Sequence, residues 1–334
     1  MKAGDFYTTV DYHDDPRWAA RAHLLPAAQG PLGGLRMLLR LLRLALAGHS
    51  LVLDVSAGRT HHEVLAAACL GLLKPLRPRA RRGVVVAMGS MWHRDPGLRG
   101  TLQGLVVRLA DRAIDRYVVQ STAELSMFPA TWGVSAGKLN CALYFWTILP
   151  KDMDGSAEQG VYVFAGGNSQ RDYTPLVQAA QALPDVQFVL ATRLLDGNSL
   201  PPNITTGQVT HSRFMQLMRG ASVVVTPIRS GLTRAAGQQT YLNAMWLGKL
   251  SVVNDVPGVR DHIVHGETGL IVEGTPESYV EALRFILDPA NNAAVCAIAE
   301  RGQHVAQEQF TFENHVTGVL QAVDAAQEAL QSVL

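Results

Sequence analysis

Two short stretches of the chain contain the residue types that bind phosphate groups. In the first, "FAGGNSQRDY", Gly166 and Gly167 follow an apolar run and Arg171 precedes a predicted helix. Glycine has no Cβ, so backbone N–H groups can approach an anion closely, and the planar guanidinium of arginine matches a phosphate with two parallel hydrogen bonds. The stretch therefore predicts a phosphate-binding turn; an ordinary strand-to-helix turn, with the arginine paired to its acidic neighbour, is the alternative. The other polar residues of this turn are Asn168 and Ser169.

The second stretch, "TRAAGQQTYLNAM", places Gly237 at the start of a predicted helix. The first N–H groups of a helix have no intrahelical partner and the helix dipole is positive at that end, so a negative ligand is favoured there. An ordinary N-terminal cap is the alternative, although long amide side chains are not usual capping residues. The first turn would offer the side chains of Gln238, Gln239 and Thr240.

An alternation of apolar runs and helical patterns would position both stretches. Continuous apolar runs separated by helices are typical of parallel strands that are buried on both faces. Strands are predicted at 51–55, 83–88, 116–121, 161–167, 186–192, 222–228, 250–255 and 268–272, and helices at 61–73, 98–113, 173–183, 212–221, from 238, 276–287, 291–309 and at the chain end. Ligands of such sheets bind at the carboxyl ends of the strands. Functional loops are therefore expected near 166–172, 192–211, 228–238 and 255–262.

The chain is expected to form two domains. Its 334 residues exceed the size that one hydrophobic core usually organises. The polar stretch "LPKDMDGSAEQG" contains Pro, Gly and Ser and is typical of a linker. We therefore place an N-terminal domain at 1–155 and a C-terminal domain at 156–334, and a cleft between domains is the default position for a site.

The composition excludes several classes of protein. With 48% hydrophobic and 17% charged residues the chain is not expected to be disordered, and 29 basic against 28 acidic side chains do not indicate a nucleic-acid partner. The three cysteines share no metal-ligand spacing and are expected to be buried thiols in a reducing compartment. The polar, acidic N-terminal residues do not resemble a signal peptide, so we expect a cytoplasmic protein. The cysteines are Cys69, Cys141 and Cys296.

The order of the motifs along the chain resembles that of a known family. The motifs "GG…R" at 166–171, "G…T…NAM…GK…VV" at 237–253 and "D.PG…D.I.HGETGLIV" at 255–272 are similar to the C-terminal half of retaining GT-B glycosyltransferases of the family 4 type. The resemblance implies an α/β GT-B fold, in which two Rossmann-like domains face each other across a cleft. It places the acceptor on the N-terminal domain and the nucleotide-sugar donor on the C-terminal domain, and it allows the last helix to cross back to the N-terminal domain.

The same resemblance implies an activity. It implies a glycosyltransferase of the hexosyltransferase type, which moves a sugar from a nucleoside-diphosphate sugar to a glycan, lipid-linked or small-molecule acceptor. Such enzymes typically stabilise the leaving diphosphate with cationic side chains and a helix N-terminus instead of a metal ion. Arg171 and the turn that begins at Gly237 would do this here, so we predict no metal and no other cofactor.

Two departures from the family pattern concern the donor. The family usually has two glutamates eight positions apart, one near the sugar and one near the ribose, and here these positions are Ala235 and Asn243. The amide of Asn243 could still bind ribose hydroxyls, whereas Ala235 offers no polar side chain. Arg171 takes the position of the family's diphosphate-binding lysine, and the position of the family's arginine falls in the glycine turn.

Two alternative functions follow from these departures. One is a non-catalytic GT-B-like subunit that binds a nucleotide sugar or a partner enzyme, and the other is a sugar-nucleotide epimerase.

Two histidines are candidates for contacts to the donor. The resemblance implies a histidine of the N-terminal domain near the donor sugar, and His93 in "GSMWHRD" is the nearest one in the expected loop. His211 lies beside the expected base-binding loop at 203–211. The alternative for both is a solvent-exposed histidine without a ligand.

A basic, leucine-rich helix is predicted in the first part of the chain. Gly33 and Gly34 open "LRMLLRLLRLALA", and in the family such a glycine pair gives the acceptor or the diphosphate access to a helix start. "KPLRPRARR" at 74–82 adds more basic residues. A core helix with a solvated face is one interpretation; the other is a surface that meets anionic lipid, which would make the protein peripheral at the inner membrane face. The basic stripe of the helix is formed by Arg36, Arg40 and Arg43.

Overall fold

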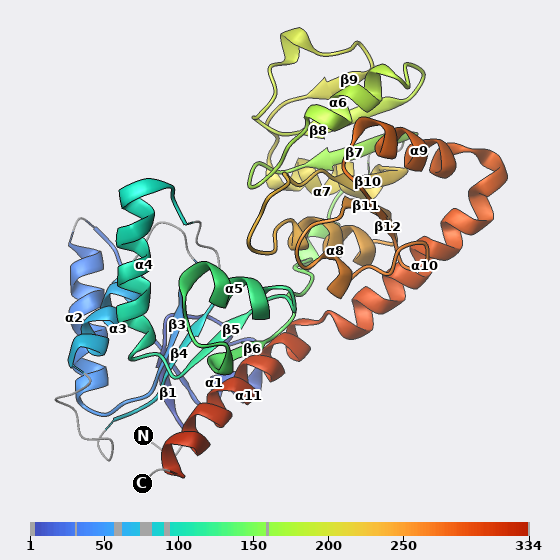
Figure 1. Ribbon diagram of the computed structural model, residues 1–334. Helices are drawn as coiled ribbons and strands as arrows, with labels where there is room; N and C mark the ends of the chain where they lie inside the picture. The colour runs from blue at the N-terminus through green and yellow to red at the C-terminus, as the bar shows by residue number, and fades with distance from the viewer. Residues whose placement is uncertain are drawn as a thin grey trace. The chain divides into compact units, whose positions relative to one another are not determined.

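The computed structural model describes residues 4–30, 32–56, 62–73, 82–89, 94–157 and 160–332. These residues form two compact units, each an α/β body (Figure 1). Unit 1 consists of Met1–Leu143 and Glu313–Leu334, and unit 2 consists of Tyr144–Phe312. Within the described ranges, none of the helices combines the length and the hydropathy that membrane crossing requires.

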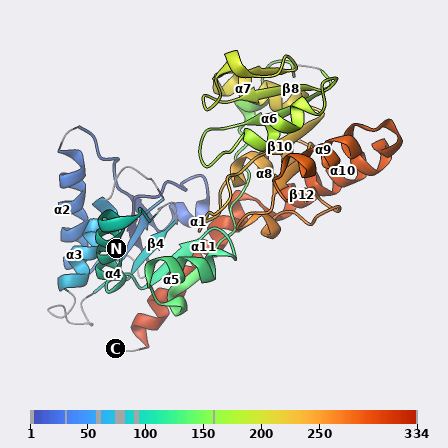
Figure 2. The ribbon, with the colours of Figure 1, turned by 45° about the horizontal axis from the view of Figure 1, so that its top comes forward.

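Unit 1 is built on a six-stranded parallel sheet with the order β2-β1-β3-β4-β5-β6. Its strands are β1 (Phe6–Thr8), β2 (Ala22–Leu24), β3 (Leu51–Asp54), β4 (Val85–Met88), β5 (Arg116–Val119) and β6 (Leu139–Cys141). Its helices are α1 (Pro16–Ala19), α2 (Gly33–Leu46), α3 (His62–Leu73), α4 (Gly97–Asp111), α5 (Glu124–Trp132) and α11 (Phe312–Gln331). Helices α2, α3 and α4 lie side by side (Figure 2), and their buried alanines and leucines share one core with β3 and β4.

The last helix, α11, belongs to unit 1 from Glu313 onward. The buried ring of His315 holds it there: Nδ1 donates to the carbonyl oxygen of Leu143 at 2.9 Å, and Nε2 accepts from the hydroxyl of Tyr12 at 3.0 Å. Burial lowers the pKa of His315 to about 4, so the ring is neutral and can play both roles. These contacts attach α11 to the segments that follow β1 and β6.

Unit 2 has a second six-stranded parallel sheet, with the order β12-β11-β10-β7-β8-β9. Its strands are β7 (Tyr162–Gly166), β8 (Gln187–Ala191), β9 (Ile204–Thr206), β10 (Val223–Thr226), β11 (Leu250–Asn254) and β12 (Leu270–Val272). Its helices are α6 (Thr174–Gln181), α7 (His211–Gly220), α8 (Gln238–Trp246), α9 (Pro276–Leu287) and α10 (Asn292–Gln309), with a 3-10 turn at Pro150–Met153. The order is that of Rossmann folds, in which the first three strands extend the sheet to one side and the next three to the other, so that the strand order reverses between the first and fourth strands, here β7 and β10.

Alternate residues of the central strands of unit 2 enter opposite cores. Val163 and Ala165 of β7 pack into one cluster with residues of α6 and α9, whereas Tyr162 and Phe164 pack into another with residues of α7. A strand that is buried on both faces needs apolar side chains at every position. This requirement explains the continuous apolar run that predicted the strand.

The linker folds onto unit 2, so the division of the structure differs from the predicted one. The sequence placed the boundary at 155/156, whereas the units divide at 143/144. The backbone N–H of Thr147 donates to Asn243 of α8 at 2.8 Å, and Asp152 lies 2.7 Å from Nε2 of His211. Because these bonds secure the polar stretch to α7 and the residues just before it to α8, the stretch belongs to the second unit.

Three-residue strands and one cysteine differ from the predictions. β9 at the sheet edge lies inside the stretch 192–211 that was expected to be a loop, and β1, β2 and β6 were not predicted. β2, β6 and β9 are edge strands, which are short and partly exposed and so lack a long apolar run, whereas β1 lies inside the sheet but has only three residues. The expectation of buried thiols is wrong: Cys296 is exposed, and Cys69 and Cys141 are only partly buried.

Candidate functional site

The two phosphate-type stretches meet at the point where the strand order of unit 2 reverses. Gly166 ends β7, and the loop after β10 leads to Gly237 at the start of α8. β7 and β10 are neighbours in the parallel sheet, so both loops leave from the same edge. This edge is where Rossmann-like sheets bind their ligands.

Arg171 links the two loops directly. Its Nη2 donates to Oγ1 of Thr240 at 2.9 Å, while Nε and Nη1 donate to the carbonyl oxygens of Gly166 and Ser169 at 3.3 and 3.0 Å. All three acceptors are neutral, and no carboxylate among the described residues contacts the guanidinium. Burial lowers the pKa of Arg171 from its ordinary value, which reflects the cost of holding this cation away from water. An anionic ligand would offset that cost.

The glycines of the first loop have different structural roles. A Cβ at Gly166 would lie 2.2 Å from Cε2 of Phe214 on α7, so glycine is needed for strand–helix packing. Gly167 has a φ of +106°, and a Cβ there would come within 3.4 Å of Nη2 of Arg171. Gly167 therefore leaves the space through which the guanidinium reaches Thr240.

Helix α8 begins without a capping side chain. Its N-cap, Gly237, has a φ of +76°, and a Cβ on it would lie 2.6 Å from Cδ1 of Ile228. The N–H of Thr240 already donates to the carbonyl of Gly237 at 2.9 Å, so the positive end of α8 lies at Gln238 and Gln239. Gln238 is buried and Gln239 is exposed.

Asn168 positions the glycine loop. Its Oδ1 accepts from the hydroxyl of Thr192 and from the backbone N–H of Arg193, both at 2.9 Å. These bonds tie the loop after β7 to the loop after β8. The side-chain oxygen of Asn168 thus already accepts two hydrogen bonds within the protein. The carbonyl oxygen of Ser169 accepts a hydrogen bond from Arg171.

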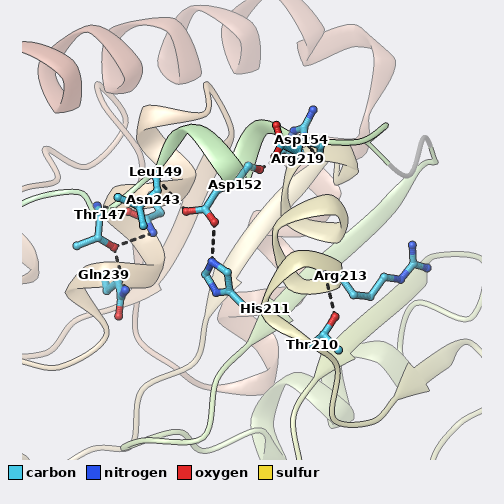
Figure 3. Close-up of polar contacts among 10 residues, drawn as sticks. All are labelled: Thr147, Leu149, Asp152, Asp154, Thr210, His211, Arg213, Arg219, Gln239 and Asn243. Carbon is cyan, nitrogen blue, oxygen red and sulfur yellow. Dashed lines mark hydrogen bonds and ion pairs between the residues drawn. The ribbon is translucent and has the colours of Figure 1, made fainter.

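Two amide side chains of α8 contact Thr147, which lies just before the linker (Figure 3). Oδ1 of Asn243 accepts from the N–H of Thr147 at 2.8 Å, and its Nδ2 donates to Oγ1 of Thr147 at 3.2 Å. Nε2 of Gln239 donates to the same hydroxyl at 2.8 Å. Asn243 is 6% exposed, and Ala235, at the other glutamate position, is also buried. The two amides therefore make polar contacts to the chain itself.

His211 also contacts the linker. Its Nε2 lies 2.7 Å from Oδ1 of Asp152, as Figure 3 shows. Burial works to raise the pKa of Asp152, but hydrogen bonds from the N–H of Leu149 and from His211 outweigh it and lower that pKa. Asp152 and Asp154 have an Asp-x-Asp spacing, which can hold a metal ion, yet the Asp152 carboxylate is taken up by these two donors. The structure thus gives His211 a partner other than a nucleotide.

The candidates in unit 1 are only partly described. His93 lies outside the described residues. Gly33 and Gly34 form the start of α2, where a Cβ at Gly33 would lie 2.9 Å from the backbone of Ala28 and one at Gly34 would lie 3.7 Å from Nδ1 of His62. The glycine pair thus brings the start of α2 close to the start of α3.

Glu63, beside this helix start, was not predicted as a candidate. Its Oε1 lies 3.0 Å from Nε2 of His62, and its Oε2 is buried with no hydrogen-bond partner. Burial, together with the nearby Asp54 at the end of β3, raises the pKa of Glu63 to about 7. A glutamate in a first helical turn is a common pattern, so nothing in the sequence indicates this environment.

We expect Glu63→Gln to stabilise the protein in a pH-dependent way. Between pH 4.5 and 7 the folded chain holds a proton on Glu63 that the unfolded chain has released, so this group lowers stability as the pH rises. The free energy of unfolding of the variant, relative to that of the wild type, should rise by up to about 3 kcal/mol between pH 4.5 and pH 8. Urea denaturation of both proteins across this range measures the difference; a constant difference would contradict the raised pKa.

Comparison with known proteins agrees with this architecture. Residues 165–289 match the family model described as Glycosyl transferases group 1. No curated protein matches the chain. A crystal structure of HepE from Anabaena in complex with UDP is similar at 17% identity and a TM-score of 0.66, covering 96% of this chain and 91% of that one. Sucrose-phosphate synthase from Thermosynechococcus elongatus is similar at 15% identity and 0.66, covering 98% and 96%. A glycosyltransferase from Rickettsia africae is similar at 10% identity and 0.63, covering 96% and 89%.

These likenesses confirm the predicted GT-B fold, with two parallel six-stranded sheets and flanking helices. The matched segment of the family model includes both Arg171 and the start of α8. The donor-type residues therefore lie in the part of the chain that is similar to group 1 glycosyltransferases.

Proposed function

We propose that this chain is a glycosyltransferase that takes a sugar from a nucleoside-diphosphate sugar, with the diphosphate bound between Arg171 and the start of α8. The observation that carries the proposal is the 2.9 Å bond from Nη2 of Arg171 to Oγ1 of Thr240. This bond places a partly buried cation next to the positive end of a helix. Among the described residues, that cation has no carboxylate partner. Two positive features at one strand edge favour a doubly charged ligand such as a diphosphate.

The chemistry requires charge stabilisation more than a protein nucleophile. Negative charge grows on the diphosphate as the bond to the sugar breaks, and a guanidinium and helix dipole that are already in place can stabilise it without reorganisation. In the proposed retaining reaction the acceptor hydroxyl attacks from the face that the diphosphate leaves. The acceptor, a glycan, lipid-linked or small molecule, would bind unit 1 near Gly33 and Gly34.

The ligands of a similar protein guide the choice of donor. HepE was crystallised with UDP and with UDP-glucose, so a uridine diphosphate hexose is the first donor to test. We further propose that no divalent metal is needed, since Arg171 and α8 supply the positive charge.

Binding measurements test both proposals. We expect UDP, or else GDP or TDP, to raise the melting temperature of the protein and to show saturable heat in calorimetry, equally in EDTA and in Mg²⁺ or Mn²⁺. The matching nucleotide sugar should be slowly hydrolysed, releasing the nucleotide. Binding or hydrolysis that vanished in EDTA and returned with metal would overturn the metal-free mechanism.

A non-catalytic subunit is the second candidate. It is favoured by Ala235 and Asn243 at the glutamate positions, and by the use of Asn243 to bind Thr147. Nucleotide binding without hydrolysis or transfer of any sugar would support a sensor subunit. If none of the nucleotides bound, the result would support a subunit that binds a partner enzyme.

A further inference from the structure

The outer face of α2 is both apolar and basic. Its buried side consists of Gly33, Met37, Leu41 and Ala45. Its exposed side carries Leu35 and Leu39, which are 54% and 56% exposed, next to arginines. A helix of a soluble core normally turns a polar face to water. The exposed residues of α2 and its cap are Leu32, Leu35, Arg36, Leu39, Arg40, Arg43 and Leu46.

The same combination continues over α3 and α4. α3 packs against both α2 and α4 and turns Leu65 and Leu72 outward. On α4, Leu98 and Leu102 are 85% and 63% exposed. We call this surface the leucine–arginine face, and Figures 1 and 2 show its three helices side by side. Its leucines are Leu32, Leu35, Leu39, Leu46, Leu65, Leu72, Leu98, Leu102 and Leu105.

The exposed charges on the three helices of this face are predominantly positive. α2, α3 and α4 contain two acidic residues, Glu63, which is buried, and Asp111, which pairs with Lys138. No carboxylate among the described residues pairs with the three arginines of α2. Contiguous exposed apolar surface marks an interaction site, and cations between the leucines specify an anionic partner. The arginines are Arg36, Arg40 and Arg43 on α2 and Arg108 on α4, with Arg99 of α4 paired to Asp95 just before that helix.

We propose that the leucine–arginine face docks on the surface of an anionic lipid bilayer. Leucine side chains would enter the boundary between headgroups and acyl chains, while the guanidinium groups would bind lipid phosphates. A second copy of the chain fits less well, because two such faces would bring arginines against arginines. This inference is independent of the proposed donor chemistry, since it concerns binding to lipid and not turnover.

Vesicle flotation of the full chain tests the proposal. The wild type should float with phosphatidylcholine vesicles that contain phosphatidylglycerol and remain unbound with phosphatidylcholine alone. Two triple variants should each be recovered with the vesicles at least about tenfold less than the wild type: Leu35→Gln/Leu39→Gln/Leu102→Gln and Arg36→Gln/Arg40→Gln/Arg43→Gln. Added salt should weaken vesicle binding of the wild type. As a matched control, Leu194→Gln/Arg284→Gln in unit 2 alters one exposed leucine and one exposed arginine and should float normally.

Three results would overturn the docking model. They are wild-type protein that does not float, equal recovery of the wild type and both variants, and equal binding to vesicles without phosphatidylglycerol. If the wild type bound no lipid but self-associated in sedimentation, and the leucine variant did not, the partner of this face would be a second copy of the chain and not a bilayer. Because all the substituted side chains are exposed, the variants should keep their melting temperature, and this measurement separates lost docking from lost folding.

Discussion

Arg171→Ala is expected to abolish measurable nucleotide-diphosphate binding and to lower turnover of the nucleotide sugar by about 100-fold or more. The side chain contributes a cation at the start of α8 and bonds Thr240 at 2.9 Å. Its charge should matter most when the diphosphate is leaving, so kcat should fall as well as affinity. Calorimetry with UDP and a donor-hydrolysis assay measure the two effects.

The stability of the same variant gives an independent check. Because Arg171 is a desolvated cation with neutral acceptors only among the described residues, its removal should leave the melting temperature of the free protein unchanged or higher. A purely structural arginine would instead lose stability when removed. Arg171→Lys should be intermediate, because it keeps the charge but not the planar fork.

Controls separate this site from general loss of positive charge. Arg284→Ala, at an exposed position of α9, should bind and turn over the donor like the wild type. Thr240→Val should weaken binding modestly, since it removes one neutral partner of Arg171. Wild-type affinity in Arg171→Ala would reject the proposed diphosphate site.

The fold was largely predictable because burial on both faces leaves a strong trace in sequence. Every residue of β7 and β11 is buried, and such strands stand out as apolar runs between helices. The strand order then brought the loops at Gly166 and Gly237 together, so the meeting of the two stretches followed from topology. Short edge strands such as β9 left no comparable trace.

The partners of individual polar residues could not be predicted in the same way. Asn243 contacts Thr147 just before the linker and His211 contacts Asp152 within it, and both partners are far away in sequence. Which polar groups meet depends on where an irregular segment packs, and neither periodicity nor turn signals encode this. The alternating Leu and Arg residues of α2 were visible in sequence, but only exposure shows that the leucines face outward.

Gly237→Ala is expected to destabilise unit 2 by about 2–3 kcal/mol and to weaken nucleotide binding about tenfold. Two costs add up at this position: alanine is strained at a φ of +76°, and its Cβ would lie 2.6 Å from Cδ1 of Ile228. Relief of that contact must shift the first turn of α8, where the positive end of the helix would meet the diphosphate. Denaturation midpoints and calorimetry with UDP measure both effects.

A matched pair of substitutions distinguishes strain from contact. Gly266 has a φ of +78° with no heavy atom within 4 Å of the Cβ position, so Gly266→Ala should cost only about 1 kcal/mol and leave UDP binding intact. Ile228→Val removes the Cδ1 atom, so Gly237→Ala should be less damaging in that background by about 1 kcal/mol. If Gly237→Ala and Gly266→Ala had equal effects, the contact with Ile228 would have no energetic role. If UDP binding survived Gly237→Ala while stability fell, α8 would support the fold without holding the ligand, and the diphosphate would depend on Arg171 alone.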